Sequence, residues 1–382
     1  MREIGAFRKP QRTIPATMAR PRSAWLALIL LLTIHASALA QRPTAAELDK
    51  TGWDAIRASK LQEAADAFRE GLRLEPRNVR LILGAAVAAN LMGRTEEARQ
   101  QLVAVLQLQP ALTDASILLG QILYRDADLA GAIQVYEQAL VHAPDNQILS
   151  TNLENWRKEI ALHDKFTQRF GDHFTVMFEG PKEEALAGKI SEMLEASYWR
   201  IGSALGAYPN GILTVVLYTN EQFRDVTRSP TWAVASFDGR IRVPMRGAVE
   251  NPRELERVLA HEFTHALIYS IASRGVPQWL NEGLAQLFEP ERGGQTPDLT
   301  GPMIPLSRLE RTFEGLDDTQ ARLAYDQSVG AVQALVDRAG MTGVLNLLSF
   351  VGQGVPFAEA FERAAFVGYA EFQASWAASR TP

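Results

Sequence analysis

The residues with the clearest capacity for chemistry are the two histidines and the glutamate of the pentapeptide His261-Glu262-Phe263-Thr264-His265. Residues four apart project from the same face of an α-helix, so His261 and His265 can direct two imidazole nitrogens at one metal ion. Glu262 is offset by one position, beside the metal, where a general base for a metal-bound water belongs. The alternative interpretation is an ordinary buried helix, because this pattern arises by chance in about one chain in a hundred of this size. The pattern therefore needs support from elsewhere in the chain.

A carboxylate in the next apolar segment supplies that support. The string PQWLNEGLA, from Pro277 to Ala285, reads as the start of a second helix. A catalytic zinc takes three protein ligands and keeps one open position. A short loop through Arg274 and Gly275 lets this second helix fold back on the first, which makes Glu282 the natural third ligand. The alternative is that Glu282 is only an acidic residue in a first helical turn, favoured by the helix dipole. With the two histidines nearby, the metal-site interpretation is favoured.

HEFTH followed by WLNEGLA resembles the gluzincin superfamily of zinc metallopeptidases, and the WLNEG string is most similar to its M1-type branch. The resemblance implies that His261, His265 and Glu282 hold one Zn²⁺ and that Glu262 is the general base. The matching region runs from about Phe170 to Trp376 and contains three short similar blocks. This part of the chain is therefore identified as a gluzincin-type domain.

The third similar block is AYDQSVGAV, which begins at Ala324 and resembles the family segment that carries a transition-state tyrosine. The resemblance implies that Tyr325 donates its hydroxyl to the oxyanion of the tetrahedral intermediate. The alternative is an ordinary half-buried tyrosine at the start of a helix.

Two departures from the M1 pattern narrow this assignment. The chain contains no GxMEN-like stretch, the element with which M1 aminopeptidases hold a free amino terminus, so aminopeptidase activity is not implied. Gln286 stands four residues after Glu282, where some relatives carry an acidic partner for a ligand histidine. The sequence is therefore most similar to the bacterial peptidase MA-like domain.

The elements that must position these residues have their own local signals. Asn251 is a good N-cap for the HEFTH helix, Pro252 suits its first position, and Glu254 is placed where a capping-box carboxylate reaches back. Just upstream, Trp232 to Val243 contains two β-prone runs joined by Asp238-Gly239, which predicts a two-residue hairpin. We expect this hairpin to be the edge strand beside the active-site helix, where an extended peptide can pair. The alternative is a hairpin that serves only the sheet.

Further regular elements are expected on both sides of this hairpin. Strands are predicted at Phe174 to Phe178 and Leu213 to Tyr218, on either side of a helix over Glu183 to Leu205. Successive short helices are expected in the last third of the chain, at Gln327–Asp337, Leu345–Val351, Phe357–Arg363 and Ala370–Trp376. The family resemblance implies that these form a helical lobe.

The first half of the chain shows a 34-residue period, because Pro76, Pro110 and Pro144 are evenly spaced. Small and aromatic residues recur around them at corresponding positions: Gly52, Ala64 and Phe68, then Ala98 and Leu102, then Gly120, Ala132, Tyr136 and Ala139. This pattern resembles the tetratricopeptide repeat, a helix-turn-helix unit of that length. Three repeats and a capping helix, over about Asn146 to Phe166, make a short solenoid. Its concave groove is expected to bind a protein or peptide, and the alternative is an arm that only packs on the second half.

The amino terminus has the form of a secretory signal. A short apolar run, Ala24 to Ile34, follows Arg20 and Arg22 and precedes an A-x-A site that ends at Ala40. The run is shorter than the roughly 20 residues that a membrane span needs. We therefore expect cleavage after Ala40, either from Met1 or from Met18 as the start, no stable membrane span afterwards, and a periplasmic or extracellular location. An uncleaved anchor is the alternative.

Composition excludes several kinds of partner and site. Residues 1–40 hold six of the 39 basic and one of the 44 acidic residues, so the remainder has a net charge of about −10. That charge argues against nucleic acid as a partner. The chain has no cysteine, so a metal site can use only histidine and carboxylate ligands, as a catalytic zinc does.

These patterns predict three parts: a signal peptide over residues 1–40, an all-α tetratricopeptide-repeat solenoid over 41–168, and an α+β zincin-like domain with a helical C-terminal lobe over 169–382. The expected function is that of an exported zinc metallopeptidase, an endopeptidase rather than an aminopeptidase, with protein or peptide substrates and a repeat arm. The alternative from a different class is a non-catalytic repeat scaffold or envelope assembly factor with a peptidase-like domain.

Overall fold

The computed structural model describes residues 42–227, 236–245, 251–290, 299, 301–311, 313 and 316–379. The predicted signal peptide lies outside the described residues. The chain from Ala45 to Pro382 forms one compact unit, within which the helical repeats and the sheet-containing half contact each other.

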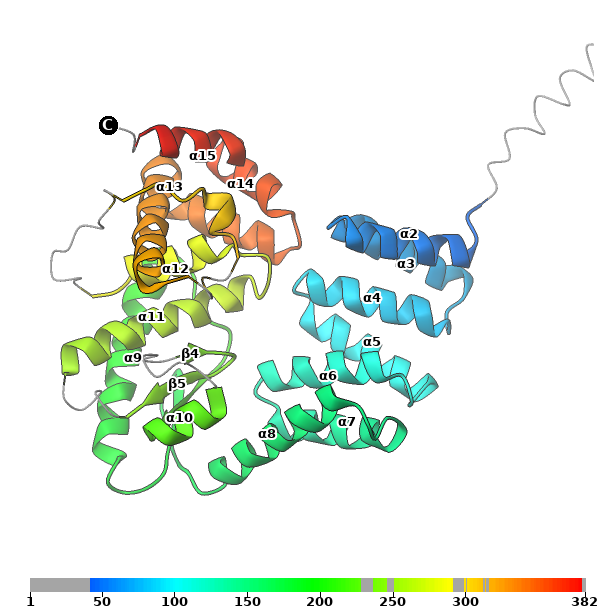
Figure 1. Cartoon of the computed structure of the whole chain (residues 1–382), viewed down its shortest axis with the longest axis horizontal. Coiled ribbons are helices and arrows are strands. Elements are labelled where there is room, and N and C mark those ends of the chain that lie inside the picture. Colours follow the sequence, from blue (N-terminus) through cyan, green and yellow to red (C-terminus); the bar gives the residue numbers. More distant parts are fainter. Residues whose placement is uncertain are drawn as a thin grey trace, which may run out of the picture. The chain divides into compact units, whose positions relative to one another are not determined.

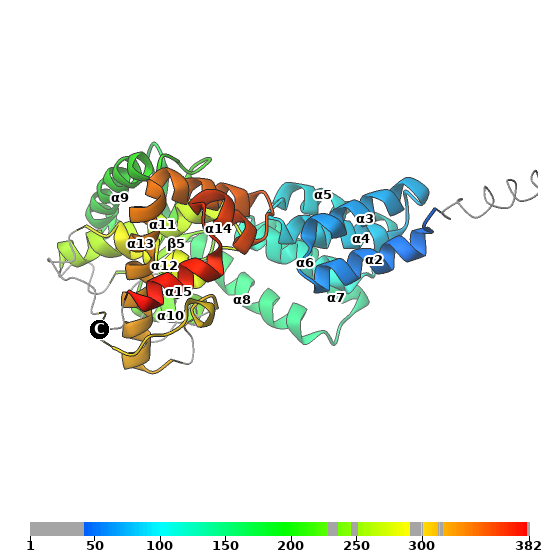
Figure 2. The same ribbon diagram turned by 90° about the horizontal axis from the view of Figure 1, so that it is seen from above.

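The first half consists of paired antiparallel helices that stack on one another (Figures 1 and 2). The first helices of the three pairs begin at Ala45, Val79 and Thr113, 34 residues apart, and α8 begins a further 34 residues on. The helices are α2 (Ala45–Arg57), α3 (Leu61–Leu74), α4 (Val79–Leu91), α5 (Thr95–Leu108), α6 (Thr113–Arg125), α7 (Leu129–His142) and α8 (Gln147–His163). The predicted tetratricopeptide-like helical repeat is confirmed by this arrangement.

The recurring small and aromatic residues pack against each other inside each pair. A Cβ atom on Gly52 would lie 2.5 Å from the ring of Phe68, and one on Gly120 would lie 2.2 Å from the ring of Tyr136. Only glycine lets the paired helices approach this closely. Each proline of the 34-residue series stands two residues after the end of α3, α5 or α7, where it cannot continue the helix.

The second half is built on a five-stranded sheet of order β1-β2-β3-β5-β4. Strands β2, β3 and β5 are parallel, and the edge strands β1 and β4 are antiparallel to their neighbours. The strands are β1 (Thr167–Phe170), β2 (Phe174–Phe178), β3 (Leu213–Tyr218), β4 (Ser236–Phe237) and β5 (Ile241–Pro244). Two helices connect them, α9 (Glu184–Leu205) and α10 (Asn220–Thr227). The predictions for β2, β3 and α9 are confirmed.

The predicted hairpin forms, but its loop differs from the expectation. Phe237 pairs with Ile241, so three residues rather than two lie in the loop, while residues 232–235 lie outside the described part of the chain. Gly239 has a φ of +102°, and a Cβ atom there would lie 2.0 Å from the backbone oxygen of Arg125. This close approach to the repeats and the left-handed φ both require glycine at this position.

The remaining helices follow the sheet in sequence: α11 (Pro252–Ile271), α12 (Gln278–Leu287), the 3₁₀ turn η1 (Leu306–Arg308), α13 (Asp318–Gly352), α14 (Phe357–Ala365) and α15 (Tyr369–Ala378). The predicted helices Gln327–Asp337 and Leu345–Val351 lie on either side of Gly340, whose non-helical φ of 68° and ψ of 171° divides α13 into two helical stretches. Helix α13 is long and apolar enough to cross a membrane by length and composition. Its Val332, Leu335 and Leu348 lie in the protein core with at most 1 % exposure.

The largest core among the described residues joins the sheet, α9 and α11 and continues into α12 to α15. Phe174 and Val215 on the strands pack with Ile190 of α9 and Phe263 of α11, and all four side chains are fully buried. Phe263 belongs to the HEFTH pentapeptide, so the same five residues anchor the helix by one face and present histidines from another.

A buried polar network joins the repeats to the sheet through Arg242 of β5, whose side chain is fully buried. Its guanidinium donates to Glu159 of α8 at 2.8 Å, to Tyr124 of α6 at 3.0 Å, to Tyr218 of β3 at 2.6 Å and to Asp238 at 3.0 Å. Burial raises the pKa of Glu159, but the positive charges of Arg242 and Arg240 outweigh burial and hold that pKa below its ordinary value. The carboxylate is therefore ionised and fully used as an acceptor.

Candidate metal centre

Helix α11 presents the two histidines, and its start is fixed by the predicted cap. The side chain of Asn251 accepts a hydrogen bond from the backbone N–H of Glu254 at 3.2 Å, and Pro252 is the first helical residue. Both carboxylate oxygens of Glu254 accept from Arg257 rather than from the backbone of Asn251, so the reciprocal half of the predicted capping box is wrong.

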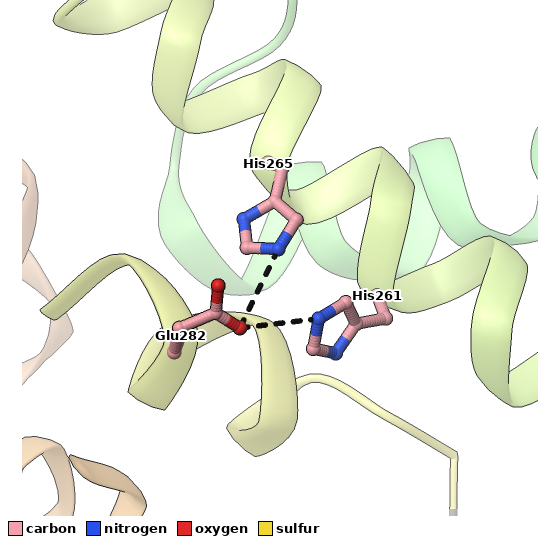
Figure 3. A group of neighbouring side chains, drawn as sticks. All are labelled: His261, His265 and Glu282. Carbon is pink, nitrogen blue, oxygen red and sulfur yellow. Dashed lines mark ion pairs between the residues drawn. The ribbon is translucent and has the colours of Figure 1, made fainter. Parts of the chain in front are cut away.

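The structure brings His261, His265 and Glu282 together from α11 and α12 (Figure 3). The Nε2 atoms of His261 and His265 lie 3.4 and 3.7 Å from Oε2 of Glu282. One potential ligand atom from each of the three residues falls within 4.8 Å of the other two. Two imidazole nitrogens and one carboxylate oxygen are the donor set of a catalytic zinc.

The hydrogen bonds around these side chains leave the facing atoms free for a metal. Nδ1 of His261 lies 2.8 Å from Oε1 of Glu289, and Nδ1 of His265 lies 3.1 Å from Oδ1 of Asn281. Each Nδ1 faces an oxygen, which can only accept a hydrogen bond, so Nε2 is the nitrogen that each ring would offer to a metal. Oε2 of Glu282 is buried and accepts no well-formed hydrogen bond. A buried acceptor without a donor, facing two imidazole nitrogens, fits a bound cation.

The pKa values of His261 and Glu282 are shifted in opposite directions by their mutual contacts. Burial lowers the pKa of His261, but its contacts with Glu282 and Glu289 outweigh burial and raise the pKa to about 10. Burial likewise raises the pKa of Glu282, and the charges of His265 and His261 outweigh it and lower that pKa. Because metal ligands must be deprotonated, zinc would replace the proton on His261.

Glu262 and Tyr325 line the same cavity as the three ligands, a space of about 590 Å³. Glu262 is 7 % exposed, and burial raises its pKa although the two histidines oppose the shift. Burial, followed by the charges of Glu282 and Glu262, raises the pKa of Tyr325 to about 12. Tyr325 is thus a protonated hydroxyl donor across the cavity from a carboxylate of raised basicity.

The close packing of α12 on α13 explains the glycine that follows Glu282. A Cβ atom on Gly283 would lie 2.5 Å from the backbone oxygen of Ser328. Ser328 lies one turn after Tyr325 on α13, so this contact holds the helix of Tyr325 against the helix of Glu282. Any side chain at Gly283 would separate the two.

Glu289 is a candidate site residue that the sequence patterns did not indicate. The family resemblance places the acidic partner of a ligand histidine four residues after Glu282, but that position is Gln286. Glu289 instead lies beyond the end of α12 and contacts both His261 and Arg257, whose Nη1 is 2.9 Å from Oε1. The sequence signal that could have indicated this residue is a carboxylate seven residues after Glu282.

Replacing Glu289 with alanine is expected to weaken zinc binding about 10- to 100-fold, because His261 loses the acceptor that orients its ring. Competition with a chromogenic chelator measures the affinity. The matched control is Glu254→Ala, which removes the other carboxylate partner of Arg257 without touching His261. Equal zinc affinity in the Glu289→Ala protein and the control would remove Glu289 from the metal centre.

No protein-family model matches this chain. Among solved structures, the chain is similar to the first TPR of Spaghetti (RPAP3) bound to an HSP90 peptide, with 23% identity, a TM-score of 0.30, and coverage of 31% of this chain and 96% of that one. The Sgt2 TPR domain from Aspergillus fumigatus is 21% identical with a TM-score of 0.31, covering 35% of this chain and 91% of that chain. The myosin chaperone UNC-45 from C. elegans, in complex with an Hsp90 peptide, is 13% identical with a TM-score of 0.32, covering 84% of this chain and 31% of that one.

Proposed function

We propose that this protein is an exported zinc metallopeptidase of the zincin-like, gluzincin type, with helical repeats that bind a protein or peptide. The observation that carries the proposal is the convergence of His261, His265 and Glu282 on one point, with Glu262 and Tyr325 lining the same cavity. An export location is supported by the signal-like sequence before Gln41.

The side chains have distinct roles in this proposal. Bound zinc would lower the pKa of a water molecule and polarise the scissile carbonyl. Glu262 accepts a proton from the attacking water and later donates it to the leaving amine, for which its burial-raised pKa is suited. Tyr325 donates a hydrogen bond to the oxygen on which negative charge develops. Glu289 and Asn281 keep the two imidazoles oriented.

The edge strand β4 supplies a place for the substrate backbone. Phe237 of β4 lines the cavity that contains the metal ligands, and β4 pairs with β5 on one side only among the described strands. An extended peptide can add to such an edge by backbone hydrogen bonds, with its scissile bond at the metal.

A second candidate function, a repeat scaffold without catalysis, is supported by a separate surface on the repeats. A space of about 500 Å³ lies between α5, α6 and α7, with Val103, Ala104 and Leu119 among its lining residues. The presence of Glu262 favours the peptidase function over the scaffold function, because a protein that only binds metal has no chemical need for a buried carboxylate beside the ligands.

Metal analysis together with a cleavage assay tests the proposal. The purified protein without residues 1–40 is expected to contain one zinc per chain and to hydrolyse peptides, and His265→Ala is expected to lose both properties. His142→Ala, a change in the repeats outside the site, is the control. Absence of zinc from the unaltered protein would overturn the proposal, and zinc without hydrolysis of any peptide would favour the scaffold.

A further inference from the structure

The cavity with the metal ligands adjoins a second one of about 390 Å³. Phe237, Tyr269 and Ser273 line both spaces. The second cavity is bounded on one side by turns of the repeats, including Gly93 and Arg125, and on the other side by the C-terminal part of α11. The two spaces therefore adjoin each other between the metal-site residues and the repeats.

Two aromatic rings mark the point where the spaces meet. Phe237 and Tyr269 contact edge to face, with ring centres 5.5 Å apart. Phe237 belongs to the edge strand β4, so a peptide that pairs with β4 would continue past these rings toward the repeats. The hairpin lies close to the repeat turn at this place, since a Cβ atom on Gly239 would be 2.0 Å from the backbone oxygen of Arg125.

Apart from the metal cluster, more basic than acidic side chains line the two cavities. Outside the metal cluster, the charged residues that line the two cavities in the described structure are Arg125, Asp126 and Arg274. Arg125 lines one of the two adjoining cavities and Arg274 lines the other, and burial, followed by the charge of Arg125, lowers the pKa of Arg274. Within the described residues, Arg274 has no ion pair, and Arg125 donates only from Nε to the backbone oxygen of Gln121 at 3.3 Å. Two half-buried cations with one neighbouring carboxylate have unused capacity for an anion.

We propose that Arg125 and Arg274 form a subsite that binds a carboxylate of the peptide held in the metal cavity. The carboxylate belongs either to an acidic side chain or to the carboxyl terminus of that peptide. Guanidinium groups bind carboxylates through paired N–H donors, and one from the repeats and one from the loop after α11 would grip the same group. A preference for cleaving peptides that carry such a carboxylate rests on the proposed peptidase function. A preference for binding these peptides does not.

Binding to the Glu262→Gln protein tests the subsite without catalysis. The probe is a synthetic library of short random peptides, prepared once with free and once with amidated carboxyl termini. Peptides retained by the immobilised protein are identified by mass spectrometry, and enrichment of Asp, Glu or a free terminus is scored. Loss of one charge-assisted contact is expected to reduce the affinity of acidic peptides about tenfold for each arginine changed to glutamine.

Matched variants decide the outcome. Arg69→Gln, an exposed repeat residue paired with Asp66, is expected to keep the enrichment, whereas Arg125→Gln with Arg274→Gln is expected to lose it. Thermal melts of all variants show that they are folded.

Enrichment only with free termini assigns the terminal carboxylate, and enrichment in both libraries assigns an acidic side chain. Equal retention of acidic and neutral peptides by the unaltered site overturns the subsite. Acid enrichment in a protein that never cleaves peptides sustains the subsite and overturns the proposed peptidase function.

Discussion

Replacing Glu262 with glutamine is expected to reduce peptide hydrolysis about a thousandfold while one zinc stays bound, since an amide cannot accept and return the proton. The side chain keeps its size and its buried place on α11, so the three ligands remain together. Hydrolysis of a fluorogenic peptide and zinc content by mass spectrometry, measured on the same preparation, give the two quantities.

The control is Glu256→Gln, which removes an exposed carboxylate from the same helix. It is expected to leave hydrolysis and zinc content unchanged. If the Glu262→Gln protein cleaves peptides at the rate of the control, Glu262 is not the general base and the mechanism above is wrong.

Replacing Arg242 with methionine is expected to destabilise the fold by about 3–5 kcal/mol, because Glu159 would keep a buried charge without its closest partner. The pair is only 2.8 Å apart, and both side chains are at most 3 % exposed. Chemical denaturation followed by tryptophan fluorescence measures the free energy of unfolding. Adding Glu159→Gln is expected to restore part of the loss, since the stranded charge is then removed.

Arg157→Met serves as the control for this experiment. Arg157 lies on α8 near Glu159, but its ion pair with Glu137 is exposed, so its removal should cost less than about 1 kcal/mol. A loss of that small size in the Arg242→Met protein would mean that the buried network contributes no more than a surface ion pair.

The parts of the fold that could be predicted are those governed by near neighbours in sequence. The 34-residue period, the N-cap at Asn251 and the strand from Leu213 to Tyr218 each depend on residues within a short segment. The hairpin loop was predicted one residue too short, and its close approach to the backbone of Arg125, more than a hundred positions earlier than Gly239, was not predicted. Contacts over that distance leave no periodic signal.

The candidate site divides in the same way. Two ligands lie one helical turn apart and the third lies in the following helix, so local spacing indicated all three. Glu289 was missed because it lies beyond the end of α12 at Leu287 and still contacts His261. No residue pattern predicts the path of the chain after that helix. Arg242 was missed because its partners come from α6, α8 and β3.

The buried contacts of Arg242 also limit how such a protein can diversify. A chain that began at Phe166 would keep Arg242 but lose Glu159 and Tyr124, which lie in the repeats. The repeats are therefore not an exchangeable module, because a replacement arm would need an acid and a hydroxyl at the same two places. Changes of partner preference are tolerated best in α2 to α5, which supply none of the hydrogen-bond partners of Arg242.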